Sequence, residues 1–280
     1  MPTVLDTLQK GTTFLEKYGV EDGRTHMQHL IAHVLKCDRM QLYVDFDRPI
    51  DEASLAALRE LTKQRASGIP LQHLLGSVEF CGREFKTDAR ALIPRPETEE
   101  LAWEILGRLD ESEIEQPRIL DVGCGSGVLG ITLALEIPEA DVTLSDVCPQ
   151  ALSLAGENAA TLEAQVTFVE SDLLAGIDGE YDLIVANLPY ISAVDMQELS
   201  REVKHDPNRA LHGGERGTEL IERLLAEAPA HLKSGGILAL EHGYDQAKAL
   251  AEAAEKTGFA SIECLKDAIK IDRFLFAVKA

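Results

Sequence analysis

Apolar residues recur at helical spacing at the beginning of the chain. Residues 3–18 and 25–35 each place apolar side chains at i, i+3, i+4 and i+7, which gives each segment one apolar face. A third helix is predicted to begin at Asp51, because a short acidic side chain suits an N-cap position, and to end near Gly68. The pattern therefore predicts that residues 1–75 form a small all-helical domain.

The periodicity changes to short β-like segments after this helical part. Two such segments flank Gly82, and residues 76–90 are predicted to form a β-hairpin linker. Two prolines, at residues 94 and 96, then predict an extended segment that leads into a helix running to about residue 109. After Pro117, strand patterns alternate with helix patterns. Strands are expected at residues 118–122, 142–146, 165–170, 181–186, 236–241, 260–265 and 274–278, and helices at residues 128–135, 149–162, 217–232 and 244–256.

This alternation implies right-handed βαβ units and a doubly wound α/β sheet. The last two predicted strands have no helical pattern between them, so we expect them to pair as an antiparallel hairpin. The fold class is therefore α/β with a small helical domain in front of the sheet.

The composition narrows the possible functions. The chain carries 48 acidic against 27 basic residues, a net charge of −21, which argues against direct nucleic-acid binding because phosphate contacts need basic residues. No apolar run approaches the ~20 residues of a membrane span, and no signal peptide is evident, so we expect a cytoplasmic protein. Five scattered cysteines and eight histidines without ligand-like spacing predict reduced thiols and no metal site.

A glycine-rich loop follows the first predicted strand of the sheet. Glycines at a strand-to-helix turn let the backbone bend tightly and approach a ligand closely. Asp146 ends the next strand, where a carboxylate typically binds ribose hydroxyls, so loop and carboxylate together predict a nucleoside-bearing cofactor. The residues expected to bind it are Asp121, Gly123, Cys124, Gly125, Ser126, Gly127 and Asp146, joined by Asp172 and Leu173 after the third strand and by Asn187 after the fourth.

Two cofactors are compatible with this loop. Gly125, Gly127 and Gly130 satisfy the G-x-G-x-x-G dinucleotide fingerprint, which would indicate a nicotinamide enzyme. The longer pattern beginning at Asp121 instead resembles the S-adenosylmethionine loop of the seven-strand methyltransferases, a class that also has an antiparallel final strand pair. The loop favours the methyltransferase but leaves both open. Asp172 could accept from an adenine amino group, or it could be a capping or turn residue.

A tetrapeptide suited to a flat, polar group follows the fourth predicted strand, at the edge of the sheet where ligands usually bind. It resembles the (N/D)-x-P-(Y/F) signature of methyltransferases that act on planar nitrogens, namely adenine or cytosine amines and glutamine amides. Its four residues are the expected catalytic and substrate-binding residues: Asn187, Leu188, Pro189 and Tyr190.

The chemistry of such a nitrogen explains the residue types. Its lone pair is delocalised, so it is a poor nucleophile, and acceptors for both of its N–H groups favour a pyramidal geometry that aims the lone pair at the methyl group. The side-chain oxygen of Asn187 and the backbone carbonyl of Leu188 would be these acceptors. Tyr190 would pack on the flat face of the substrate, and Pro189 would stiffen the turn.

Two further segments narrow the resemblance to one family. Residues 92–99 read Leu-Ile-Pro-Arg-Pro-Glu-Thr-Glu, and residues 241–243 read Glu-His-Gly. With the helical N-terminus and the linker, they make nearly the whole chain similar to the glutamine methyltransferases acting on peptide-chain release factors. Arg95 and Glu97 are then candidates for the cofactor or substrate entrance, unless they simply pair with each other, and His242 is interpreted as structural.

The resemblance implies a fold, a reaction and a partner. The fold is a seven-stranded Rossmann-like methyltransferase sheet with an antiparallel last strand. The reaction is methyl transfer from S-adenosylmethionine, with S-adenosylhomocysteine as product and no metal, to the glutamine of the release factor's Gly-Gly-Gln motif. It also implies a helical substrate-recognition domain (residues 1–75), a hairpin linker (76–90) and a methyltransferase domain (91–280). No direct contact with nucleic acid or membrane is expected, and the protein is expected to be a monomer.

Leu188 is a departure from the family pattern, which usually has Asn-Pro-Pro-Tyr. A leucine supplies the backbone carbonyl equally well, but without a following proline the backbone of Asn187 is less restricted. Asn-Leu-Pro-Tyr is also the form in ribosomal RNA adenine dimethyltransferases. An adenine methyltransferase of nucleic acid, a glutamine methyltransferase of a ribosomal protein, and a binding module with an inert sheet therefore remain as alternatives.

Overall fold

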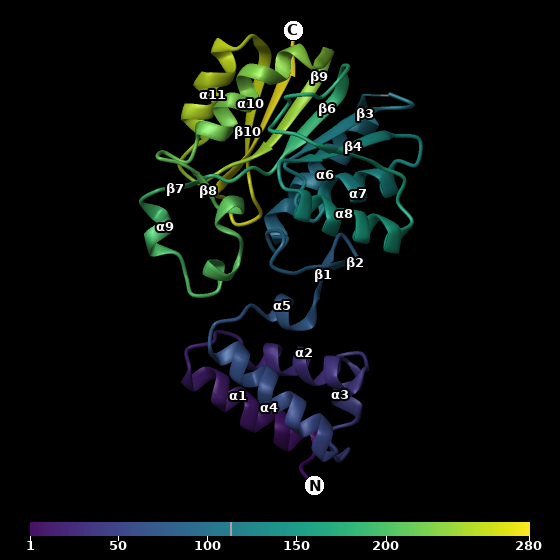
Figure 1. Ribbon diagram of the computed structural model, residues 1–280, viewed down its shortest axis with the longest axis vertical. Helices are drawn as coiled ribbons and strands as arrows, with labels where there is room; N and C mark the ends of the chain where they lie inside the picture. The colour runs from purple at the N-terminus through teal and green to yellow at the C-terminus, as the bar shows by residue number, and fades with distance from the viewer. Residues whose placement is uncertain (113) are drawn as a thin grey trace. The chain divides into compact units, whose positions relative to one another are not determined.

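The chain forms two units in a computed structural model that describes residues 1–112 and 114–280 (Figure 1). The first unit contains Met1–Ser77 together with Ser200–His205, and the second contains Val78–Leu199 and Asp206–Ala280. No pattern in the sequence indicates that residues 200–205 belong with the N-terminal helices. Within the described residues, no helix is both long and apolar enough to cross a membrane.

The first unit is helical, as the apolar spacing predicts. Thr3 caps the first helix by accepting from the Asp6 N–H at 3.2 Å, and Asp51 caps α4 by accepting from the Ser54 N–H at 2.9 Å. The apolar faces of α1, α2 and α4 form one buried core. The helices of this unit are α1 (Val4–Lys17), α2 (Gly23–Leu35), α3 (Gln41–Val44), α4 (Glu52–Ala66) and α5 (Leu71–Leu75).

A buried arginine attaches residues 200–205 to this unit. The Arg65 side chain is almost completely buried, and its guanidinium donates to His26 Nδ1 at 3.0 Å and to the Ile69 carbonyl at 3.2 Å. Its remaining nitrogen pairs with the carboxylate of Glu202. A buried cation is tolerated only when such acceptors surround it. Burial, followed by the charge of Arg65, lowers the pKa of His26, so this ring accepts as a neutral imidazole.

A β-hairpin follows the N-terminal helices, and from Val78 on it belongs to the second unit. Strands β1 (Ser77–Phe80) and β2 (Arg83–Lys86) are joined by Cys81 and Gly82, both at positive φ, which is the conformation of a tight two-residue hairpin turn. Phe80 and Phe85 meet edge to face, with ring centroids 5.9 Å apart, and both side chains are buried in the core of the second unit.

The second unit contains the predicted seven-stranded sheet. Its strand order is β10-β11-β9-β6-β3-β4-β5. Strand β11 runs antiparallel to both of its neighbours, β10 and β9, and the other pairs are parallel, so the predicted α/β fold with an antiparallel last strand is confirmed. The strands are β3 (Arg118–Val122), β4 (Asp141–Asp146), β5 (Thr167–Glu170), β6 (Tyr181–Ala186), β9 (Leu232–Glu241), β10 (Phe259–Lys266) and β11 (Asp272–Lys279).

Two apolar cores cover the two faces of this sheet. Helices α6, α7 and α8 pack on one face, and α10 and α11 pack on the other (Figure 1). This arrangement brings the carboxyl ends of β9, β6, β3 and β4 to one edge of the sheet. The helices are α6 (Pro96–Glu111), α7 (Val128–Glu136), α8 (Pro149–Leu162), α10 (Glu219–Glu227) and α11 (Ala247–Lys256).

Some predicted boundaries are wrong. The helix expected over residues 217–232 ends at Glu227, because Pro229 lacks a backbone N–H and the chain continues as a 3₁₀ turn, Ala228–Ala230. Strand β9 then begins at Leu232, four residues before the predicted start.

The segment between β6 and α10 contains structure that the sequence did not predict. It forms a two-stranded parallel sheet from β7 and β8, with short helical turns between them. Its elements are β7 (Ile191–Ser192), α9 (Asp195–Glu198), the 3₁₀ turns η1 (Val203–His205) and η2 (Asn208–Ala210), and β8 (His212–Gly214).

The Arg65–Glu202 pair generates the first prediction. Because Glu202 is half exposed, we expect Glu202→Gln to weaken the attachment of residues 200–205 by only about 1–2 kcal/mol, which raises the population of the detached segment about tenfold. Trypsin should then cleave after Arg201 and Lys204 correspondingly faster. Glu198→Gln, in the exposed helix α9, is the matched control, and equal cleavage rates in the two variants would contradict the attachment.

Candidate active site

Polar residues end or follow four neighbouring parallel strands of the sheet. Glu241 ends β9, Asn187 follows β6, Asp121 lies one residue before the end of β3, and Asp146 ends β4. Because these strand ends meet at one edge, side chains that lie far apart in the sequence share one region. This edge is the position where open α/β sheets bind their ligands.

The glycine loop is built from residues at positive φ. Gly123, Gly125 and Gly127 have φ values of 70°, 56° and 82°, a region in which a side chain would be strained. Asp146 holds this loop, since its two carboxylate oxygens accept from the Gly125 N–H at 3.0 Å and from the Cys148 N–H at 2.8 Å. Asp146 therefore ties the glycine loop to the segment that follows β4.

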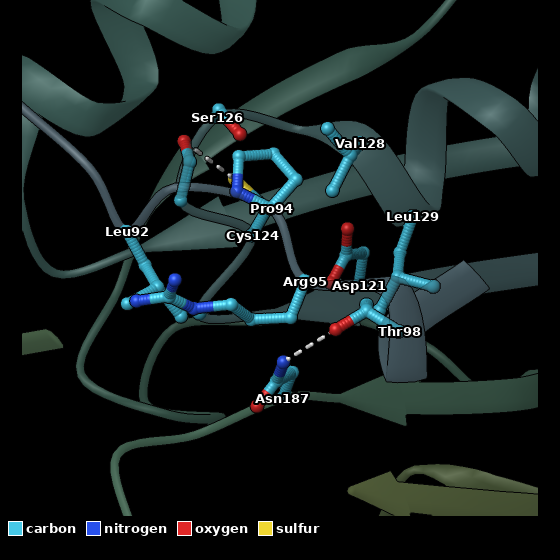
Figure 2. A pocket seen from close by; sticks show the side chains of 12 residues that line it. Leu92, Pro94, Arg95, Thr98, Asp121, Cys124, Ser126, Val128, Leu129 and Asn187 are labelled. Atoms are coloured by element: carbon cyan, nitrogen blue, oxygen red, sulfur yellow. Dashed lines mark hydrogen bonds between the residues drawn. The ribbon is translucent and has the colours of Figure 1, made fainter. Parts of the chain in front are cut away.

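Two adjoining pockets lie along the loop, and all their lining residues belong to the second unit. The small pocket, of about 50 Å³, is shown in Figure 2 with Thr98, Asp121 and Asn187 around it. The large pocket, of about 140 Å³, is lined by residues that include Asp146 and Leu173. The two pockets share four lining residues, so they form one bipartite groove: Leu92, Gly123, Gly125 and Asn187.

Asp121 is a buried carboxyl at the small pocket. Its Oδ2 accepts from the Gly130 N–H at 2.9 Å, which ties the end of β3 to helix α7. Burial raises the pKa of Asp121 to about 7, the bond from Gly130 opposes this rise, and the charge of Asp146 adds to it. A cation in the small pocket would therefore be stabilised by this carboxylate and would lower its pKa.

Asn187 lines both pockets, Leu188 and Pro189 line the large pocket, and Tyr190 lines neither. Side chains behind this tetrapeptide hold it in place. Asn187 Nδ2 donates to Thr98 Oγ1 at 3.0 Å, as Figure 2 shows, and the Thr98 hydroxyl donates to the Glu241 carboxylate at 2.7 Å. Tyr190 donates its hydroxyl to the other oxygen of Glu241 at 3.2 Å. Burial, followed by the charge of Glu241, raises the pKa of the Tyr190 hydroxyl, so this side chain stays neutral.

Leu188 packs against the glycine loop. Its side chain is buried, and a Cβ added at Gly123 would lie 2.8 Å from Leu188 Cδ2. Leu188, the residue that departs from the family pattern, thus occupies the space beside Gly123 that a side chain at position 123 would need.

The remaining predicted residues are distributed around the groove. Arg95 lines the small pocket, and its guanidinium pairs with buried Asp206 at 2.6 Å rather than with Glu97. The alternative interpretation, in which Arg95 and Glu97 simply pair with each other, is therefore wrong. Asp172, at the rim of the large pocket, is exposed and pairs with Arg223 at 3.2 Å.

Sequence reasoning missed several residues at the site. Thr98 and Glu241 lie in the two segments that carry the family resemblance, which is the signal that could have found them. Val147 lines the large pocket and is 62% exposed, directly after Asp146.

His242 is completely buried, with Nδ1 2.8 Å from the Gly243 carbonyl. In the described part of the chain, no three His, Cys, Asp or Glu side chains are grouped as metal ligands would be.

Fold and site together define the class of the protein. The protein has the features of a methyltransferase that acts on a planar nitrogen. These features are a doubly wound sheet, a glycine loop preceded by the acidic residue Asp121, and an Asn-x-Pro-Tyr segment beside that loop. Solved methyltransferases share the fold: 16S rRNA N2 G1207 methyltransferase of Thermus thermophilus, with a TM-score of 0.55 at 20% identity, covering 73% of this chain and 50% of that chain; and a methyltransferase of Pyrococcus furiosus, with a TM-score of 0.52 at 20% identity, covering 71% and 90%.

The sequence relatives identify the family. Residues 6–76 match the PrmC N-terminal domain, and residues 104–215 match the methyltransferase small domain. The release factor glutamine methyltransferase of Deinococcus radiodurans is 41% identical, with 98% of each chain covered, and that of Geobacter sulfurreducens is 37% identical, with 97% of this chain and 95% of the other covered. The chain belongs to the release factor glutamine methyltransferase family. The nicotinamide and inert-sheet alternatives are thereby set aside.

The buried Asp121 carboxyl predicts how stability changes with pH. Its pKa rises from 3.8 to about 7 on folding, so the folded protein binds the proton more tightly, and the free energy of unfolding should fall as pH increases from about 4 to about 7. Asp121→Asn keeps the acceptor for Gly130 and should remove up to about 4 kcal/mol of this fall. Urea unfolding without added ligand at pH 5 and pH 8 measures the difference, and an identical pH dependence in both proteins would contradict it.

Proposed function

We propose that this protein transfers the methyl group of S-adenosylmethionine to the side-chain amide nitrogen of the glutamine in the Gly-Gly-Gln motif of peptide-chain release factors. The observation that carries the proposal is the hydrogen-bonded Asn187, which is fixed at the junction of the two pockets with its amide nitrogen turned toward Thr98. Membership of the release factor glutamine methyltransferase family supports the same acceptor.

The groove offers a complementary group for each part of the cofactor. Asp146 already accepts two backbone N–H groups, and each of its oxygens keeps a lone pair for a ribose hydroxyl. Val147, Asp172 and Leu173 line the large pocket, where they suit an adenine ring. Asp121 suits the cationic amino group of the methionine part in the small pocket, because a positive charge stabilises its ionised form.

The tetrapeptide acts on the acceptor amide. S-adenosylmethionine supplies a methyl group on a sulfonium, which is already an activated leaving group, so the proposed reaction needs no metal. Asn187 Oδ1 and the Leu188 carbonyl accept the two N–H groups of the glutamine, which weakens the delocalisation of its nitrogen lone pair. The nitrogen gains a bond to the methyl carbon as the S–C bond breaks, and the extra proton leaves to water. Pro189 and Tyr190 limit the space for the flat amide.

The partner assignments follow from the division of the chain. Since the lining of the groove comes from the second unit alone, we propose that the helices of the first unit recognise the protein substrate. The net charge of −21 favours a protein substrate over nucleic acid. We place the enzyme in the cytoplasm as a monomer, with no membrane contact.

Methylation of a release factor is the direct test. Incubation with labelled S-adenosylmethionine should label a purified release factor, and the label should disappear when the glutamine of its Gly-Gly-Gln motif is replaced. Ribosomal RNA and ribosomal proteins are the competing acceptors in the same assay. Labelling of either one, with the release factor unlabelled, would overturn the proposed acceptor.

Two variants separate cofactor binding from acceptor activation. Asn187→Ala removes an acceptor of the reacting amide, so kcat should fall about 10²–10³-fold while the Kd of S-adenosylmethionine changes little. Asp146→Ala frees the glycine loop and removes the ribose acceptor, so Kd should rise at least about tenfold. Calorimetry and initial rates measure both, with thermal unfolding as the control. Losses that merely track a lowered Tm would refute the assignment.

A further inference from the structure

A buried carboxylate lies behind the tetrapeptide, in direct contact with Tyr190 and linked to Asn187 through Thr98. Glu241 is 1% exposed and lines neither pocket. One of its oxygens accepts from the Thr98 hydroxyl, which in turn accepts from Asn187, and its other oxygen accepts from Tyr190. Glu241 therefore acts on the groove only through other side chains.

The chemistry of these groups gives the chain of hydrogen bonds a direction. An ionised carboxylate only accepts, so the Thr98 hydroxyl must spend its single hydrogen on Glu241 and can offer Asn187 only a lone pair. Asn187 can satisfy that lone pair only with its NH₂ group. Its oxygen then faces away from Thr98, as Figure 2 shows.

The alternative orientation would defeat the reaction. The oxygen and the nitrogen of an asparagine amide have nearly the same shape, so packing alone distinguishes them poorly. With the amide reversed, two N–H donors would face the N–H groups of the substrate amide. An acceptor is required at that position, so the orientation of Asn187 must be set by its partner.

We propose that Glu241 is a positioning residue that fixes the direction of the hydrogen bonds from Asn187 through Thr98 to itself, and thereby presents the Asn187 oxygen to the acceptor nitrogen. This inference rests on the proposed function and deepens it, because it assigns Thr98 and Glu241 to the same site.

The turn after β9 holds the other end of the tetrapeptide in the same manner. The Gly243 N–H donates to Gln246 Oε1 at 2.8 Å, and Gln246 Nε2 donates to the Tyr190 carbonyl at 2.8 Å. A Cβ added at Gly243 would lie 3.0 Å from the Gln246 amide carbon. Residues 241–243 thus position both Asn187 and Tyr190 from one turn.

The surroundings of Glu241 make its charge sensitive to pH. Burial raises the pKa of Glu241, and the bonds from Thr98 and Tyr190 oppose this rise. Among the nearby charges, Arg273 lowers the pKa and Glu97 raises it. A protonated Glu241 could donate to Thr98, which would release the hydroxyl to turn and Asn187 to reverse. The ionised form is thus the active one, and kcat should fall as pH decreases through the raised pKa.

Near-isosteric variants test this arrangement. Glu241→Gln replaces an obligatory acceptor by a side chain that can also donate, and Thr98→Val removes the hydroxyl. Each should lower kcat for release-factor methylation about 10–100-fold, with the KM of the release factor and the Kd of S-adenosylmethionine within about threefold of the parent protein. The acidic limb of the kcat profile at saturating cofactor should be absent in both variants. Thr98→Ser, which restores a hydroxyl, should recover most of the rate lost in Thr98→Val.

The control is Thr132→Val, in helix α7. Thr132 is also completely buried, and its hydroxyl has no hydrogen-bond partner among the described residues, so kcat should stay unchanged. Parent-like kcat in Thr98→Val or Glu241→Gln would overturn the inference, as would a loss confined to KM or cofactor affinity. If the parent protein itself fails to methylate a release factor while binding S-adenosylmethionine, the proposed function fails instead.

Discussion

The cost of removing carboxylates from water is the constraint that organises the active edge of this sheet. Strands β9 and β4 end in an acidic residue there and β3 has one next to its end, and each of these carboxylates has a different set of partners. Asp146 accepts two backbone N–H groups and so orders the glycine loop, whereas Glu241 accepts two hydroxyls and so orders the tetrapeptide. Asp121 accepts a single N–H, which leaves its charge poorly compensated until a cation arrives. The least satisfied carboxylate thus lies where a positively charged ligand is expected.

Local sequence patterns predicted the fold well because the apolar periods of strands and helices depend mainly on neighbouring residues. Alternation of strand and helix periods, and the absence of a helix before the last strand, were enough for the sheet and its antiparallel β11. The errors occur where a single residue or a distant contact overrides the period. Pro229 shortens α10, and residues 200–205 join the N-terminal helices through Arg65, which lies 137 residues from Glu202. Such a contact leaves no periodic trace in the sequence.

The site shows the same division between local and distant information. The glycine loop, Asp146 and the tetrapeptide could be found because each is a short pattern at the end of a strand. The role of Thr98 could not be found from a local pattern, because its partners Asn187 and Glu241 are 89 and 143 residues away. A threonine in the first turn of a helix also has an ordinary local explanation, namely that it helps to start the helix. For Arg95 the sequence left open a local pair with Glu97, but its partner in the structure, Asp206, is 111 residues away. Spatial proximity at the strand ends, rather than any local preference, gives these residues their function.

The hydrogen bonds through Thr98 also account for the tolerance of Leu188. A proline at this position would restrict the backbone of Asn187 and so limit where its side chain can point. In this chain the side chain itself is held by Thr98, and the backbone is held by the packing of Leu188 against Gly123 and by the bond from Gln246 to the Tyr190 carbonyl. In this chain, hydrogen bonds and packing restrain Asn187, whereas a proline at position 188 would restrain it through its ring. The three segments that carry the family resemblance are therefore parts of one arrangement, in which the threonine of the first and the glutamate of the last determine which atom of Asn187 faces the substrate.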